Sequence, residues 1–350
     1  MYDLKDYGFS TALLPEGVQG IPARITAVHR ERYALICEYG EVFGRLKSSE
    51  YYDRGGEAFP TTGDFVLIDY NPAGDSRILA TLPRRSFFSR RDPTPGRGEQ
   101  AVAANFDYVF ILQSLNYDLN IRRLERYLTQ AWQSGAVPVV VLTKADLVED
   151  TLEAVRMIED AAVGVEVFAV SARTGAGLEA LKRYLCPGKT LVLLGSSGVG
   201  KSSLVNALAG EELMSTGEIR EDDSKGRHTT THRQLITLNS GVMIIDTPGM
   251  RQLGMWDVSE GLGETFADVE ALLGCCRFSD CKHDREPGCA IRDALQSGAL
   301  SLQRWQSYQS LRGEARYTDD PESYRRKKQE RNKAIAQNSR RMKREGKIRK

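Results

Sequence analysis

The segment Gly195–Ser203, Gly-Ser-Ser-Gly-Val-Gly-Lys-Ser-Ser, contains the residue types that bind nucleotide phosphates. It matches the pattern G-x-x-x-x-G-K-S, whose glycines let backbone N–H groups converge on a phosphate at a helix N-terminus. We expect Lys201 to contact the β- and γ-phosphates as a catalytic residue, and the Ser202 hydroxyl to ligate Mg²⁺. A strand at Leu191–Leu194 and a helix from Lys201 would flank the loop. The expected phosphate-binding residues are Gly195, Ser196, Ser197, Gly198, Val199, Gly200, Lys201, Ser202 and Ser203.

The motif Asp-Thr-Pro-Gly, from Asp246 to Gly249, follows an apolar strand expected at Val242–Ile245. An aspartate at the carboxyl end of a buried strand is where a P-loop enzyme approaches its metal, usually through water. The Gly249 N–H can then bind the γ-phosphate. Because the motif follows both a strand and the phosphate loop, we interpret it as part of a nucleotide site rather than as a plain turn.

The residues Thr143–Asp146, Thr-Lys-Ala-Asp, resemble a guanine-recognition motif that usually begins with Asn. The Asp146 carboxylate can accept hydrogen bonds from guanine N1–H and N2–H₂, groups that adenine does not present. The Lys144 stem would lie along the base, whereas Thr143 leaves open whether the usual side-chain contact to the phosphate loop is kept. Ser171-Ala172 fits a second base contact, with the Ala172 N–H facing guanine O6.

The stretch Gly226–His232, Gly-Arg-His-Thr-Thr-Thr-His, is a candidate switch segment. A threonine of such a segment completes the Mg²⁺ shell and senses the γ-phosphate, and one of Thr229 to Thr231 should do this, with Thr230 as our first choice. Position 250 is Met250, where many GTPases carry a glutamine that orients the attacking water. His228 is our candidate for this task, because a neutral imidazole accepts a hydrogen bond from water; the alternative is that it only packs in a loop.

The order of the motifs differs from that of ordinary GTPases, in which the phosphate loop comes first and base recognition last. Here Thr143–Asp146 and Ser171-Ala172 precede Gly195–Ser203, and Asp246–Gly249 comes last. Each motif nevertheless ends a strand of one sheet, and joining the termini elsewhere leaves such a site intact. The sequence therefore predicts a circularly permuted GTPase domain.

A Cys/His cluster near the C-terminal end has the residue types of a metal site. Cys276, Cys281, His283 and Cys289 lie within fourteen residues of sequence. Three thiolates and one imidazole make a closed tetrahedral Zn²⁺ set, which is structural rather than catalytic. The neighbouring Cys275 is a spare thiol, and the alternative for the whole cluster is a group of buried free thiols with a surface histidine.

The elements that must position these residues differ along the chain. Residues 20–85 contain short strands separated by turn residues, a spacing that favours a five-stranded OB-type barrel. Such a barrel often binds oligonucleotides, although a purely structural barrel has the same pattern. Residues 83–91 combine basic residues with two aromatics, which suits either RNA stacking or a linker that buries Phe87. The expected strands are Ile21–Val28, Arg32–Glu38, Glu41–Leu46 and Asp64–Tyr70.

From about residue 104, near-continuous apolar runs alternate with helical segments. This pattern predicts a doubly wound α/β domain with helices on both faces of a parallel sheet. We expect an OB-fold RNA-binding domain at 1–90, the GTPase domain at 91–255, and a zinc-binding helical domain with a basic tail at 256–350. The expected strands of the sheet are Tyr108–Leu112, Val137–Leu142, Val165–Val170, Leu191–Leu194 and Val242–Ile245, with helices at Ile121–Trp132 and Leu178–Leu185.

Composition places the chain among soluble globular proteins, with 350 residues of which 41% are hydrophobic and 27% charged. No secretory signal and no run of ~18–20 apolar residues is present, so we expect a cytoplasmic protein with no membrane partner. The net charge of +1 conceals a basic run from Arg325 to Lys350. Such a run either binds a polyanion such as RNA or stays a solvated tail.

Together these regions resemble the bacterial family called ribosome small subunit-dependent GTPase A. The permuted order, Gly195–Ser203, Gly226–Thr231 and the Cys/His cluster match its pattern, and the resemblance extends from the barrel to about Arg312. It implies an OB domain, a permuted GTPase domain and a zinc domain that clamp the small (30S) ribosomal subunit. It also implies GTP or GDP, Mg²⁺ and one structural Zn²⁺ as ligands, and 16S rRNA as a partner. We expect a monomer.

Two interpretations of the activity remain open at this point. In the first, the protein is a slow GTPase that the small subunit stimulates during late 16S rRNA maturation, as the resemblance implies. In the second, it is an RNA-binding placeholder in which GTP only sets the conformation. Lys201, Ser202 and Asp246 favour the first interpretation, and Met250 keeps the second open.

Overall fold

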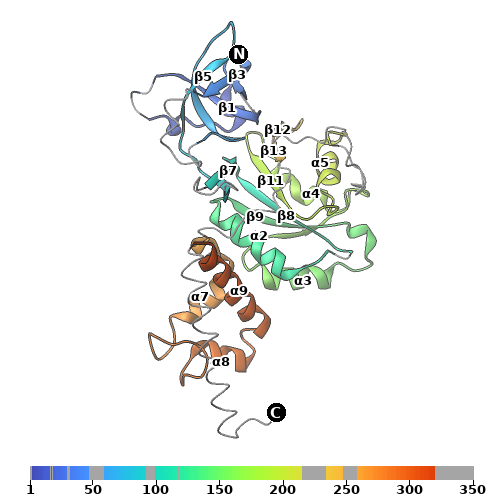
Figure 1. Ribbon diagram of the computed structural model, residues 1–350. Coiled ribbons are helices and arrows are strands. Elements are labelled where there is room, and N and C mark those ends of the chain that lie inside the picture. The colour runs from blue at the N-terminus through green and yellow to red at the C-terminus, as the bar shows by residue number, and fades with distance from the viewer. Residues whose placement is uncertain are drawn as a thin grey trace, which may run out of the picture. The chain divides into compact units, whose positions relative to one another are not determined.

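The chain divides into two compact units, Met1–Gly254 with Gly263–Thr265 and Met255–Leu262 with Phe266–Lys350. Figure 1 shows the computed structural model, which describes residues 2–15, 17, 19–29, 32–46, 59–91, 99–116, 118–214, 234–246 and 258–319. Within these ranges, none of the helices has the length and apolar character that crossing a bilayer requires. The domain boundaries at residues 90 and 255 stay predictions.

Five strands at the N-terminal end close into a barrel in the order β1-β2-β3-β5-β4, because β4 also pairs with β1. Only β3 and β5 pair in parallel. Alternate side chains fill the interior, where Ile25, Leu35 and Ile78 are almost fully buried. The predicted OB-type barrel is thus confirmed, and β5 is the strand that the sequence did not delimit. The strands are β1 (Ile21–Val28), β2 (Tyr33–Cys37), β3 (Gly40–Leu46), β4 (Phe65–Asp69) and β5 (Ser76–Thr81).

The basic and aromatic segment after the barrel begins a two-stranded hairpin, β6 (Phe87–Arg91) and β7 (Glu99–Ala104). Arg84 forms a bidentate salt bridge with the fully buried Asp64, in which both nitrogen–oxygen distances are 2.8 Å. Phe88 is buried and stacks on Phe106 with ring centroids 4.8 Å apart, whereas Phe87 is 38% exposed. The segment therefore anchors the barrel, and the expectation that a linker would bury Phe87 is wrong because the strand turns Phe88 inward.

The second part of the first unit is a six-stranded sheet in the order β10-β9-β8-β11-β13-β12 (Figure 1). All of its strands are parallel except β12, which is antiparallel to β13. The apolar runs of the sequence predicted the bounds of the five parallel strands to within two residues. The strands are β8 (Tyr108–Ser114), β9 (Val137–Thr143), β10 (Val167–Ala169), β11 (Thr190–Leu194), β12 (Gln234–Thr237) and β13 (Met243–Asp246).

Both faces of this sheet are covered, as the predicted α/β domain requires. Ile111 and its neighbour Leu112 on β8 point to opposite faces, and each joins a separate buried cluster. One cluster includes residues of α2 and α3, and the other includes residues of α4 and α5. The predicted helix 178–185 is split, because its last turn tightens into a 3₁₀ turn that buries Tyr184 against the aromatic rings of β8 and β10. The helices are α2 (Ile121–Gln133), α3 (Leu152–Ala161), α4 (Leu178–Leu181) and α5 (Lys201–Ala209).

Barrel and sheet are joined by main-chain pairing and by one buried cation. Ala27 of β1 pairs with Gln234 of β12, so one ladder continues from the barrel into the α/β domain. The fully buried Arg24 donates hydrogen bonds to the carbonyl oxygens of Tyr7, Gly63 and Asn105 at 2.6, 3.2 and 2.9 Å. Burial lowers the pKa of Arg24 to about 9, so the guanidinium still carries its charge at neutral pH. These contacts hold the two parts of the first unit together.

The described residues of the second unit, 258–262 and 266–319, contain helices and no strand, in agreement with the predicted helical C-terminal domain. Its core includes Phe266, Trp305 and Tyr308, and the Tyr308 ring contacts the rings of the other two. Arg304 forms a two-pronged pair with Asp268 at 3.1 and 2.9 Å, which holds α9 against α7. The helices are α6 (Ser259–Thr265), α7 (Ala267–Leu273), α8 (Ala290–Ser297) and α9 (Leu302–Asp319).

Candidate nucleotide and metal sites

The phosphate loop lies between β11 and α5, as the sequence predicts. Gly198 and Gly200 have φ values of 71° and 101°, a left-handed conformation that favours glycine and tightens the loop. Lys201 begins α5, and its Nζ donates to the carbonyl oxygens of Gly195 and Ser196 at 2.8 and 2.6 Å. The ammonium therefore lies over the loop, where phosphate oxygens can replace the two carbonyls as its partners. Ser202 and Ser203 lie in the first turn of α5, and Ser197 is exposed in the loop.

Thr143 links the phosphate loop to the strand that carries the base-recognition motif. It ends β9, and its Oγ1 donates to the carbonyl oxygen of Val199 at 2.5 Å, with the Gln113 carbonyl oxygen further away at 3.3 Å. The side chain is 4% exposed, so the hydrogen bond is shielded from water. Thr143 stands where the motif usually has Asn, and its hydroxyl makes the side-chain contact to the phosphate loop.

A second side chain supports the phosphate loop from the turn between β8 and α2. The Ser196 hydroxyl donates to Asp118 Oδ2 at 2.5 Å, and Asp118 Oδ1 pairs with Arg123 at 2.8 Å. The Gln113 side chain exchanges two hydrogen bonds with the backbone of Asn120, which fixes this turn. Sequence reasoning missed Asp118, because no spacing pattern connects it with a loop that lies 78 residues further along the chain.

The base-recognition residues lie at the adjacent ends of β9 and β10. Asp146 Oδ1 accepts a hydrogen bond from the Ser171 hydroxyl at 2.6 Å, and Asp146 Oδ2 pairs with Arg173 Nε at 3.2 Å. The Ser171 hydrogen bond chiefly lowers the pKa of Asp146, and the charges of Arg173 and Lys144 lower it further. The carboxylate is therefore ionised at neutral pH, as an acceptor for guanine must be. Ala172 lies in the turn that follows β10, and Arg173 is a residue that sequence reasoning missed.

Asp246 is the last residue of β13, which pairs in parallel with β11 through Val192 and Ile245. The ends of these two strands are therefore neighbours, as a metal-proximal aspartate beside a phosphate loop requires. Its side chain and four further candidates lie outside the described residues, namely His228, Thr230, Gly249 and Met250.

The motifs thus meet at one edge of the sheet despite their order in the chain. The carboxyl ends of parallel strands lie at the same edge, and β9, β10, β11 and β13 each lead into one motif. The central β8 pairs with β9 on one side and with β11 on the other. This edge can hold a guanine base beside β9 and β10 and its phosphates beside β11.

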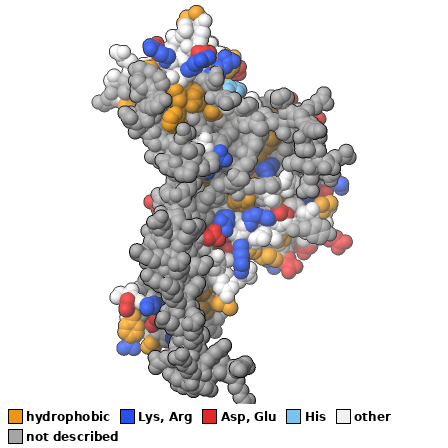
Figure 2. Space-filling model, viewed as in Figure 1, with side chains coloured by type: hydrophobic (Ala, Val, Ile, Leu, Met, Phe, Trp, Pro, Cys, Tyr) orange, Lys and Arg blue, Asp and Glu red, His pale blue; other side chains and the backbone are white. Residues whose placement is uncertain are grey.

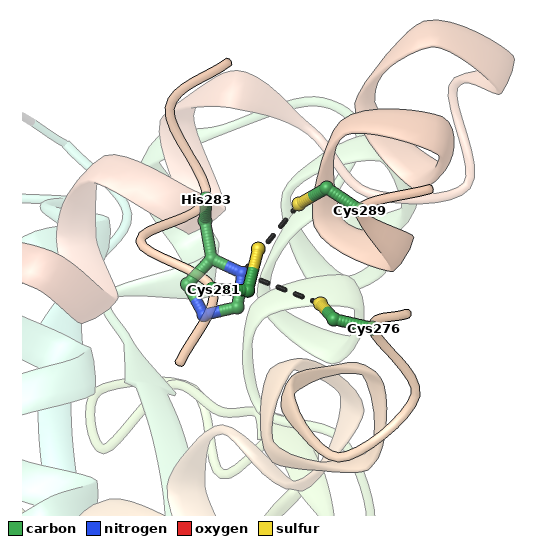
Figure 3. A group of neighbouring side chains, drawn as sticks. All are labelled: Cys276, Cys281, His283 and Cys289. Atoms are coloured by element: carbon green, nitrogen blue, oxygen red, sulfur yellow. Dashed lines mark hydrogen bonds between the residues drawn. The ribbon is translucent and has the colours of Figure 1, made fainter. Parts of the chain in front are cut away.

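The Cys/His cluster of the second unit brings its ligand atoms together (Figure 3). One atom each from Cys276, Cys281, His283 and Cys289 lies within 4.8 Å of all the others. His283 Nδ1 is 3.5 Å from the sulfur atoms of both Cys276 and Cys289. In a tetrahedral zinc site with ordinary bond lengths, sulfur and nitrogen ligands are about 3.6 Å apart, so this donor set fits Zn²⁺. Cys275 is exposed and directs its sulfur to the Ala271 carbonyl oxygen, outside the cluster.

Comparison with known proteins gave consistent matches. The model of the RsgA GTPase family matches residues 81–256. The small ribosomal subunit biogenesis GTPase RsgA 2 of Listeria monocytogenes serotype 4b (strain F2365) is 47% identical over 316 residues, 90% of each chain. RsgA 2 of Lactiplantibacillus plantarum (strain ATCC BAA-793 / NCIMB 8826 / WCFS1) is 45% identical over 320 residues, again 90% of each chain.

Two solved structures are similar in fold. YjeQ from Thermotoga maritima has a TM-score of 0.63 and 26% identity, and the match covers 83% of this chain and 96% of that one. YloQ, described as a circularly permuted GTPase, has a TM-score of 0.59 and 23% identity, with 84% and 94% covered. The likeness to YloQ supports the permuted arrangement of strands.

The Thr143 contact leads to a first prediction. Thr143→Val removes the hydroxyl that holds Val199, so the phosphate loop loses a shielded hydrogen bond, and we expect GDP to bind about three- to tenfold more weakly. Fluorescence titration with a labelled GDP measures this. Thr190→Val is the matched control, since the Thr190 hydroxyl is buried at the opposite end of β11 without a hydrogen-bond partner among the described residues. Equal affinities of both variants and the unaltered chain would contradict the role of Thr143.

The Cys/His cluster leads to a second prediction. Cys281→Ser replaces one thiolate of the set, so we expect zinc content to fall from about one ion per chain to near zero, with loss of helical signal from the second unit. Elemental analysis and circular dichroism measure the two effects. Cys275→Ser should keep its zinc, because that sulfur faces away from the cluster. If the unaltered chain purified without zinc, or if both variants lost zinc equally, the assignment of a zinc site to this cluster would be wrong.

Proposed function

We propose that this chain, which belongs to the RsgA GTPase family, hydrolyses GTP to assist late assembly of the small ribosomal subunit and maturation of its 16S rRNA. The family is one of GTPases, so the chain is a GTPase that uses GTP, GDP and Mg²⁺. One observation carries the proposal: an ionised aspartate after β9 and the phosphate loop after β11 lie at the same edge of the sheet, on either side of β8, and the Thr143 hydroxyl links the end of β9 to the loop. The role in subunit assembly comes from relatives named small ribosomal subunit biogenesis GTPases.

In this proposal, separate residues at the sheet edge bind the base and the phosphates of GTP. Asp146 accepts hydrogen bonds from guanine N1–H and N2–H₂, Lys144 lies along the base, and the Ala172 N–H meets O6. Lys201 and the N–H groups of Gly195–Ser203 hold the phosphates and neutralise charge that develops on the transferred group. Bound Mg²⁺ would neutralise phosphate charge and so lower the repulsion toward the attacking water. Ser202 and Thr230 are its proposed ligands, with Asp246 reaching it through water and Gly249 binding the γ-phosphate.

The attacking water needs a group to orient it, and we assign this role to His228. Met250 stands where a glutamine would act in many GTPases, and a thioether is too weak an acceptor for that task. A neutral imidazole accepts a hydrogen bond from water and places its oxygen toward the γ-phosphate. If contact with the small subunit places the His228 side chain beside this water, hydrolysis becomes dependent on the subunit.

The barrel offers a surface suited to rRNA. Phe43 is 39% exposed, and the guanidinium of Arg32 lies 3.8 Å from the centre of its ring. Tyr39 is 53% exposed and stacks on Tyr70 with ring centroids 4.5 Å apart. Figure 2 shows Lys and Arg side chains beside apolar ones on the barrel end of this face. Exposed aromatic rings with nearby cations bind bases by stacking and phosphates by charge, which supports contact with single-stranded rRNA.

The proposal also covers the metal site, the basic run, the cellular location and the oligomeric state. The Cys/His cluster holds one structural Zn²⁺ that stabilises the second unit, and the basic run from Arg325 to Lys350 adds charge for rRNA. Assembly of ribosomes places the protein in the cytoplasm. We propose that it acts as a monomer. The competing function is an RNA-binding placeholder in which GTP only sets the conformation, an alternative that Met250 keeps open.

GTP turnover with and without small ribosomal subunits tests the proposed function. We expect stimulation on the order of tenfold or more by small subunits, because a partner that positions the water-orienting group completes the site. Large subunits, free rRNA and ATP as substrate are the controls and should give no comparable increase. If GTP binds but small subunits leave turnover unchanged, the placeholder function replaces the hydrolytic one.

The role of His228 is tested separately. His228→Ala should lower subunit-stimulated turnover about a hundredfold, the size of a typical acid–base contribution, while GDP affinity stays unchanged. His232→Ala changes a histidine of the same segment and should keep most of the turnover. Full turnover in His228→Ala, or equal losses in both variants, would remove His228 from the mechanism.

A further inference from the structure

We propose that Arg173 competes with guanine for the Asp146 carboxylate and so acts as a built-in gate on nucleotide binding. The inference rests on the proposed base-reading role of Asp146. The guanidinium of Arg173 offers N–H donors in one plane, and the edge of guanine that carries N1–H and N2–H₂ does the same. Arg173 therefore presents to Asp146 the same type of donor that the base presents.

The contacts of Asp146 show how the competition arises. Its Oδ1 accepts a hydrogen bond from the Ser171 hydroxyl at 2.6 Å, and its Oδ2 lies 3.2 Å from Arg173 Nε in an ion pair. The Asp146 side chain is 12% exposed, whereas that of Arg173 is 78% exposed. Ser171 thus holds the carboxylate within the fold, and Arg173 reaches it from the solvent side. A base that approaches from solvent meets Arg173 on that side.

The exposure of Arg173 sets the size of the effect. An ion pair with one partner largely in water contributes little, so the gate is closed only part of the time. A site that is available for a fraction of the time has its apparent Kd raised by the inverse of that fraction, here about two- to fivefold. Because the competitor is tethered beside the site, it retakes the carboxylate whenever guanine leaves. The gate therefore lowers the affinity for GDP and for GTP alike, because both carry the same base.

The test compares guanine-nucleotide affinity in Arg173→Gln and in the unaltered full-length chain, using a fluorescent GDP. Removing the competitor should lower the Kd about two- to fivefold, whereas Arg173→Lys, which keeps a cation, should stay close to the unaltered chain. Arg156→Gln makes the same change at an exposed arginine of α3 and should have no effect. Binding of inorganic tripolyphosphate should be unchanged in Arg173→Gln, because that probe does not need Asp146.

A double variant separates the gate from the base-reading role. Asp146→Asn should shift preference toward xanthosine diphosphate, whose C2 carbonyl accepts from the Asn amide. Adding Arg173→Gln to Asp146→Asn should leave the affinity for xanthosine diphosphate unchanged, because the neutral Asn side chain forms no ion pair with Arg173. An unchanged or raised Kd for GDP in Arg173→Gln would overturn the gate alone. If Asp146→Asn left the guanine preference intact, the base-reading role would fall, and the gate with it.

Discussion

The pairing of β8 with both β9 and β11 is the constraint on which the nucleotide site depends. Val109 of β8 is paired with Pro138 of β9 and with Val192 of β11, and it is fully buried. This ladder fixes the distance between the strand ends that lead to the base-recognition motif and to the phosphate loop. Since the site depends on which strands are neighbours, and not on their order along the chain, a permuted sequence can build it.

Hydrogen bonds between side chains and backbone turn this strand arrangement into a defined site. Thr143 ties β9 to the phosphate loop, and Asp118 supports the same loop from the turn after β8. The barrel belongs to the same structure, because β1 continues the ladder through β12 and Arg24 binds carbonyl oxygens from both parts. A movement of β12 or β13 would therefore reach the barrel through the main chain.

Sequence reasoning predicted those features that depend on local pattern. Apolar runs predicted the parallel strands, because such strands are buried on both faces. The spacing of the glycines predicted the phosphate loop, and that of the cysteines predicted the Cys/His cluster. It did not predict Asp118, Arg173 or the burial of Arg24, because each depends on residues brought together from distant parts of the chain. The alternative that a linker buries Phe87 failed for a related reason, because the layer against which a strand packs decides which of its side chains point inward.

The central claim is that motifs from four strand ends form one guanine-nucleotide site. Its most direct test is an experimental structure of the chain with Mg²⁺ and a non-hydrolysable GTP analogue. We expect guanine N1 and N2 to lie within hydrogen-bond distance of the Asp146 carboxylate, and the β-phosphate to lie among the N–H groups of Gly195–Ser202. A base bound away from β9 and β10, with Asp146 still paired to Arg173, would contradict it.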